Sequence, residues 1–127
     1  MQELMKCLKT YTENLQVLHR NVYGIDFYPT HEQLSEYYDM LQGITDDITE
    51  IGIGIGYKEE QFDTKELIEV VDRNSKESFT EVKRMFDDII VIINRIKDVP
   101  ADVINKLQEY QEQLRKESEY KLTKVIK

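Results

Sequence analysis

The fold is decided by residues 4–33, which read LMKCLKTYTENLQVLHRNVYGIDFYPTHEQ. In the first part of this stretch apolar residues recur every three or four positions, the spacing that places side chains on one stripe of an α-helix. The stripe consists of Leu4, Leu8, Tyr11, Leu15, Leu18 and Val22. Gly24 and Pro29 then interrupt the pattern, so we expect the helix to end near Tyr23 and a short loop to follow.

A second helix is predicted to begin at about His31. Thr30 is a good N-cap, and Gln33 three residues later can complete a capping box. The apolar stripe of this helix consists of Tyr37, Leu41, Ile44, Ile48 and Ile51. Isoleucine and glycine alternate from residue 51 to residue 56 and should finish the helix, since each interior glycine costs about 1 kcal/mol relative to alanine. The two helices would form an antiparallel hairpin.

One short and two long helices are predicted beyond the glycines. Asp63 with Glu66 matches a capping box for the short helix, and Ser78 with Glu81 matches one for the third long helix. Pro100 ends that helix and can occupy the first turn of the last one. The apolar residues are Leu67, Ile68 and Val71 in the short helix, Phe79, Val82, Phe86, Ile89, Ile93 and Ile96 in the third long helix, and Val103, Leu107, Tyr110, Leu114, Leu122 and Val125 in the last.

This order of helices predicts a single all-α domain over residues 1–127. Each pair of long helices is joined by a tight link, whereas a long connection separates the two pairs. A long central crossover makes the second and third long helices parallel, which distinguishes the ferritin-like four-helix bundle from an up-down-up-down bundle. We therefore predict a ferritin-like four-helix bundle with a short extra helix in the crossover.

The composition agrees with a helical protein and excludes several functional classes. Only five glycines, two prolines and no tryptophan occur, which suits helices better than sheets. The formal net charge of -8 argues against general nucleic-acid binding, which needs clustered Lys and Arg, so we expect no direct DNA binding. No signal peptide or membrane span is visible, and Cys7 is the only cysteine. We expect a soluble, cytoplasmic protein in which Cys7 is a small buried apolar residue, not a reactive thiol.

The second helix and the histidines offer ligands for a metal. His19 and His31 are the only two histidines and flank the first hairpin loop, so the hairpin should bring their imidazoles together. One polar face of the second helix carries His31, Ser35, Asp39, Gln42, Asp46 and Glu50. The ordinary interpretation is a solvated face. Asp46 and Glu50 are four residues apart, however, and can place two carboxylates, which iron accepts alongside imidazole, around one cation.

Helix geometry requires that this site be shared between two copies of the chain. Asp46 lies about 22 Å along the helix from His31, so one chain cannot place both on the same ion. If two copies pack second helix against second helix about a two-fold axis near Met40 and Leu41, His31 of each copy meets Asp46 and Glu50 of the other. The predicted metal ligands are His19, His31, Asp46 and Glu50, with Asp39 and Ser35 as auxiliary ligands, and no further catalytic residue is predicted.

The sequence contains the run Leu18-His19-Arg20-Asn21-Val22-Tyr23-Gly24, followed by Phe27 and His31-Glu32. This arrangement resembles the signature of the Dps family. Dps proteins are miniferritins that protect DNA during starvation. The family has a helix that ends in His-Trp-Asn-x-x-Gly, then a Phe, then a second His at the spacing found here. Asp46 with Glu50 matches an Asp and a Glu four residues apart in its second helix. The turn over residues 98–102 also resembles the family.

The resemblance implies a shell of twelve subunits built from two-fold dimers. Ferrous iron would be oxidised at sites between two subunits, usually with hydrogen peroxide, and stored as a ferric mineral. Two positions depart from the pattern: Ser35 stands where the family has an acidic ligand, and Arg20 replaces the tryptophan after the first His. Both changes should weaken iron binding, and Asp39 could partly substitute for the missing acid.

Two functions from different classes follow. The first is an iron-binding ferroxidase that stores iron and protects against oxidative stress. The alternative is a ferritin-like assembly or interaction protein that has lost efficient ferroxidase activity, as Ser35 and Arg20 would allow. A helical bundle unrelated to iron is the third interpretation.

Overall fold

The computed structural model describes every residue from Met1 to Lys127, and all of its regular secondary structure is helical. The long helices are α1 (Gln2–Arg20), α2 (Phe27–Gly54), α3 (Ser75–Arg95) and α4 (Ala101–Arg115). The last continues through a π-helical stretch, η2 (Lys116–Leu122), into α5 (Thr123–Ile126). A single 3₁₀ turn, η1 (Thr64–Glu66), lies between α2 and α3.

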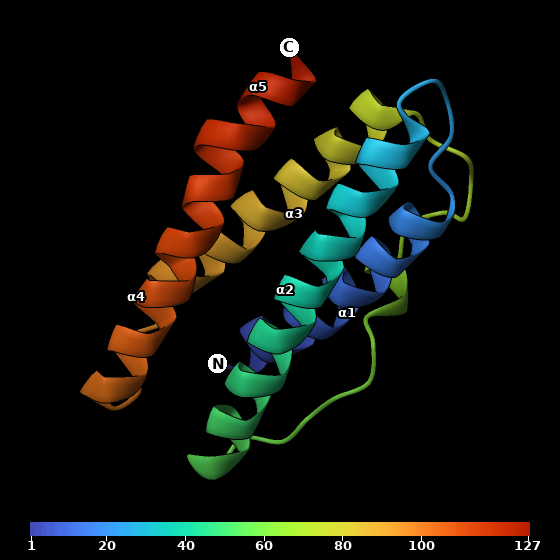
Figure 1. Ribbon diagram of the computed structural model, residues 1–127. Coiled ribbons are helices and arrows are strands. Elements are labelled where there is room, and N and C mark those ends of the chain that lie inside the picture. Colours follow the sequence, from blue (N-terminus) through green and yellow to red (C-terminus); the bar gives the residue numbers. More distant parts are fainter.

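The long helices form two antiparallel hairpins, α1 with α2 and α3 with α4 (Figure 1). The connection over residues 55–74 leaves the far end of α2, runs back along α1 and enters α3 at the opposite end of the bundle. Consequently α2 and α3 run in the same direction (Figure 1). Contacts are most extensive between α1 and α2, whereas α2 and α4 meet at few residues. None of the helices is both long and apolar enough to cross a membrane.

The predicted apolar stripes supply most of the core. Every residue of the first stripe is buried, and the second and third stripes are buried except at their last residues, Ile51 and Ile96, which are half-buried. Periodicity missed Leu34 in α2 and Met85 in α3, which are wholly buried as well. The prediction of an all-helical bundle around one core is confirmed.

The last helix departs from the predicted stripe. Tyr110 is only half-buried and Val125 is 53% exposed, whereas Ser118 is fully buried between Leu114 and Leu122. These three buried residues are four positions apart, and the wider π-helical turns of η2 keep such residues on one face. The Ser118 carbonyl accepts hydrogen bonds from Thr123 and from Lys83 of α3, which help to satisfy the backbone of the widened turns.

Two helices begin earlier than predicted. The second long helix starts at Phe27, not at about His31, because the chain reverses at Gly24 with a φ of 116° and Pro29 is tolerated in the first turn. Thr30 is buried, and its hydroxyl donates to the Ser75 hydroxyl instead of capping a helix.

The third long helix starts at Ser75, one turn before the predicted Ser78–Glu81 box. Asn74 caps it in a reciprocal capping box with Glu77. Ser78 is fully buried inside the helix, and its hydroxyl has no hydrogen-bond partner. The prediction of a capping box was therefore right in kind and wrong in position.

The predicted short helix in the crossover is wrong in extent. Only the 3₁₀ turn η1 forms, and Asp63 caps it by accepting from the Lys65 amide. The reason is Asn14, a fully buried residue of α1. Its side chain donates to the Glu66 carbonyl and accepts from the Ile68 amide, so these backbone groups are satisfied without a helix.

Candidate functional site

The two histidines meet at the loop end of the α1–α2 hairpin. His19 lies in the last turn of α1 and His31 in the second turn of α2, and their ring centroids are 4.6 Å apart with an interplanar angle of 26°. Phe27, the first residue of α2, stacks on His31 with ring centroids 5.1 Å apart. The hairpin therefore brings the two imidazoles together, as the spacing predicts, and an aromatic ring supports them.

Hydrogen bonds determine which ring nitrogens are free. His31 Nδ1 lies 2.9 Å from the backbone carbonyl oxygen of His19. Because a carbonyl oxygen can only accept, Nδ1 carries the proton, and in the neutral ring Nε2 keeps its lone pair. Metal-binding histidines typically have this arrangement. The Nδ1 atom of His19 is buried and has no hydrogen-bond partner.

The surroundings of His19 favour its neutral form. Burial lowers the pKa of His19 below its ordinary value, and the neighbouring His31 and Arg20 lower it further. The backbone carbonyl of Gln16 and the carboxylate of Asp39 oppose this shift more weakly. At neutral pH the imidazole is therefore uncharged, which is the state that a metal ion needs.

The predicted carboxylate ligands lie far from the histidines within one chain. Asp46 and Glu50 are exposed on the second half of α2, and the unbroken helix places Asp46 about 22 Å from His31. Asp39 is exposed and Ser35 is half-buried, both between the two ends. No group of three or more His, Cys, Asp or Glu side chains within the chain could hold a metal ion. The predicted ligands thus form two separate sets within the chain.

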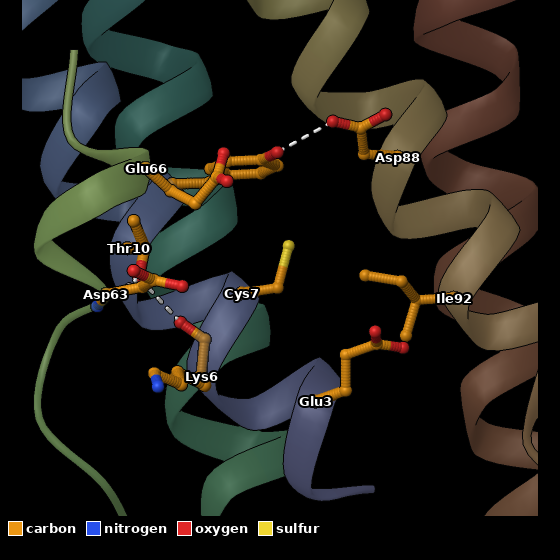
Figure 2. Close-up of a pocket in the computed structure, with 9 residues that line it drawn as sticks. Glu3, Lys6, Cys7, Thr10, Asp63, Glu66, Asp88 and Ile92 are labelled. Carbon is orange, nitrogen blue, oxygen red and sulfur yellow. Dashed lines mark hydrogen bonds between the residues drawn. The ribbon is translucent and has the colours of Figure 1, made fainter.

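A cavity between α1, the crossover and α3 was missed by sequence reasoning (Figure 2). Its volume is about 320 Å³. Figure 2 shows the Cys7 sulfur directed into it, with carboxylates around the rim. The lining consists of Glu3, Lys6, Cys7, Thr10, Tyr11, Asp63, Glu66, Asp88 and Ile92. These residues come from three separate elements, so no local pattern could have predicted the cavity.

The chemistry of this cavity is unreactive. Burial raises the pKa of the Cys7 thiol to about 12, and the carboxylates of Asp88 and Glu3 add to the effect. A protonated thiol is a poor nucleophile and a poor metal ligand. The Tyr11 hydroxyl donates to Asp88 at 2.6 Å, and burial together with this bond raises the pKa of Tyr11. The interpretation of Cys7 as unreactive thus agrees with its surroundings, although its side chain is only partly buried.

The overall fold has a counterpart among solved structures. The chain matches no protein-family model, and no curated protein sequence matches it. It is similar to the crystal structure of antigen TpF1 from Treponema pallidum, with a TM-score of 0.80 and 20% sequence identity. The match covers 99% of this chain and 88% of that chain. At this level of identity the similarity concerns the fold alone, so the chain is a helical bundle whose fold is similar to that of TpF1.

Proposed function

We propose that the chain is a Dps-like, ferritin-like bundle that binds ferrous iron at sites shared by two copies, oxidises it with hydrogen peroxide and stores it in an oligomeric shell. The parallel direction of α2 and α3 and the long crossover between them support the ferritin-like assignment. The Dps-like signature around His19 and His31 supports the family. A shell of twelve subunits follows from that resemblance.

The observation that carries the proposal is the pair of stacked imidazoles at one end of α2 and the exposed carboxylates at the other. Two copies related by a two-fold axis across the middle of α2 would bring His19 and His31 of one chain to Asp46 and Glu50 of the other. Two nitrogens and two carboxylates form a donor set that ferrous iron accepts. Iron is the substrate at this site, and peroxide would take up its electrons.

The test is oxidation of ferrous iron by peroxide, followed through ferric absorbance. His31→Ala and Asp46→Ala should slow the reaction at least about tenfold, because each removes a ligand. Glu36→Ala is the matched control, since Glu36 is an exposed carboxylate of α2 outside the proposed ligand set. Equal rates for the parent and both ligand variants would contradict the proposed iron site. Light scattering on the same samples checks for a shell.

The second candidate is an assembly protein with the same two-fold pairing and no efficient ferroxidase activity. Half-buried Ser35 is the specific observation in its favour, because the family pattern has a carboxylate at that position. This candidate predicts that the parent oxidises iron no faster than the two ligand variants while it still assembles. Ser35→Glu should then raise the rate, since it restores a charged ligand.

A further inference from the structure

Arg20 is an unpaired cation beside the histidines. It lies exposed in the last turn of α1, next to His19. Of the five arginines it alone makes neither an ion pair nor a side-chain hydrogen bond. Of the other four, Arg73 donates to backbone carbonyls, and Arg84, Arg95 and Arg115 each form an ion pair with a carboxylate. The guanidinium of Arg20 is therefore free to bind a group outside its own chain.

Helix α2 presents the opposite charge without a partner. It contains six acidic residues and no lysine or arginine. Asp47 pairs with Lys106 of α4, but Asp46 and Glu50 are exposed and make no ion pair. Two copies of α2 packed face to face would place two helices of the same charge side by side, which is unfavourable. A cation from outside α2 at each end of the proposed two-fold interface would offset this repulsion.

The spacing of residues on one face of α2 favours a particular register for such a pairing. One face of α2 carries residues 28, 31, 35, 39, 42, 46, 50 and 53. The intervals between these residues are the same when they are counted from either end of the helix. The centre of this pattern falls between Met40 and Leu41. An antiparallel pairing about that point places Tyr28, which is 82% exposed, opposite Ile53, which is 51% exposed. The apolar side chains at the two ends of the face would thus cover each other.

The same register brings the loop end of one chain to Glu50 of the other. His31 falls opposite Glu50, and Ser35 falls opposite Asp46. Arg20 follows His19, whose carbonyl accepts the His31 ring N–H, so Arg20 lies at the level of His31 along the bundle. The free guanidinium and the free carboxylate therefore come to the same place.

We infer that in the two-fold dimer the Arg20 guanidinium of each copy binds the Glu50 carboxylate of the other. This inference rests on the two-fold pairing of the proposed function. A guanidinium can donate two parallel hydrogen bonds to one carboxylate, so the pair is specific as well as attractive. The chain thus supplies its own cation at the end of the interface where iron is proposed to bind. To bind Glu50, iron must displace the Arg20 guanidinium. The dimer persists without metal.

Self-association of the metal-free protein tests the ion pair. A dilution series in the ultracentrifuge should show that Arg20→Ala dissociates at a concentration at least about tenfold higher than the parent. Arg115→Ala is the matched control, because Arg115 is an exposed arginine that pairs within its own helix, and it should dissociate like the parent. Arg20→Glu should dissociate further, and combining it with Glu50→Arg should restore association. Equal association of Arg20→Ala and the parent, or no recovery in the double variant, would overturn the inference.

Anaerobic titration with Fe²⁺ separates this inference from the proposed function. Arg20→Ala lacks the competing guanidinium, so it should bind Fe²⁺ about tenfold more tightly than the parent does. The titration is made at a protein concentration at which this variant is associated. Equal affinity in the two proteins would overturn the competition. If Arg20 controls association and no variant binds Fe²⁺, the ion pair stands and the iron function is contradicted. If the parent binds Fe²⁺ and Arg20→Ala associates as the parent does, the ion pair is contradicted and the iron function stands.

Discussion

Asn14 is fully buried on α1, and both ends of its amide side chain bond to the backbone of the crossover. Thr10, one turn earlier, accepts from the Asp63 amide in the same region. These polar side chains attach an otherwise irregular segment to the helix beneath it. A buried amide side chain stabilises the fold when both its N–H and its C=O groups are hydrogen-bonded. Removing it is costly, because its buried backbone partners are then left unsatisfied.

Replacing Asn14 with leucine should lower the free energy of unfolding by about 2–3 kcal/mol, because the Glu66 carbonyl and the Ile68 amide lose their partner. Urea denaturation followed by circular dichroism measures this loss. Asn105→Leu is the control, since Asn105 is exposed on α4 and should change stability by less than about 0.5 kcal/mol. Equal effects at the two positions would show that the buried amide contributes nothing.

The lowered pKa of His19 predicts a pH dependence of stability. Burial, and then His31 and Arg20, keep the folded-state pKa below the ordinary value of 6.5. The unfolded chain therefore binds the proton more readily. The contribution of His19 is complete above that ordinary value and is lost as the pH falls from there towards the folded-state pKa. Urea midpoints measured between pH 7.5 and pH 5 should show this loss, and His19→Gln should reduce it. An identical pH profile in the variant would contradict the assignment to His19.

Single residues were predictable from the sequence where a local pattern determines their place. The buried stripe of α1 and the approach of His19 to His31 both follow from helical spacing and a short turn. The role of Asn14 does not, because its partners lie more than fifty positions away. The cavity at Cys7 was missed for the same reason, since its walls come from α1, the crossover and α3.

Two glycines of α2 have opposite surroundings, which gives a paired prediction for this helix. A Cβ on Gly52 would lie 2.4 Å from the Met5 sulfur, whereas a Cβ on Gly43 would meet nothing within 4 Å. Gly52→Ala should therefore destabilise the protein by about 1–3 kcal/mol through crowding against α1. Gly43→Ala should stabilise it by up to about 1 kcal/mol through helix propensity. Thermal unfolding of both variants at a dilution that keeps the chain monomeric tests the pair, and the same sign for both would contradict it.

Helix boundaries were the least predictable feature at the scale of elements. Asn74 with Glu77 and Ser78 with Glu81 both match the capping box, and they lie about one helical turn apart. The earlier pair is used because Ser78 is buried among core residues, where the chain is already helical. Capping rules identify possible starts, and tertiary packing selects among them.

At the scale of the whole molecule, the direction of the helices was predictable from connection lengths. Short links make antiparallel neighbours, and the long connection over residues 55–74 makes α2 and α3 parallel. The candidate site was predictable only as two halves. His19 with His31 and Asp46 with Glu50 lie at opposite ends of α2, and their meeting depends on a second copy. The meeting of the two halves stays a prediction.

Thermal stability should depend on protein concentration if two copies pair through α2. A hundredfold increase in concentration should raise the melting temperature by roughly 4 °C, because association stabilises only the folded chain. Differential scanning calorimetry of the metal-free protein measures this shift. Tyr28→Ser should reduce it, since Tyr28 is 82% exposed in the single chain and is placed opposite Ile53 in the pairing.

The control for this experiment is Tyr120→Ser, because Tyr120 is also an exposed tyrosine, at 58%, and lies in η2, outside the proposed α2 pairing. Its concentration dependence should match that of the parent. A melting temperature that does not change with concentration in the parent would contradict the two-fold pairing itself.

The π-helical stretch η2 bears on how the length of this chain can change. Wider turns accommodate an additional residue without interrupting the helix, which is how a one-residue insertion can be tolerated in a packed helix. Deleting one residue between Arg115 and Thr123 would therefore return the segment to ordinary helical geometry, and the turns from Thr123 onward would still present the same face to α3. Deleting a residue from an ordinary turn of α4 would instead rotate everything after it by about 100°. In this helix, the π-helical stretch is the place where a residue can be lost without turning the chain end.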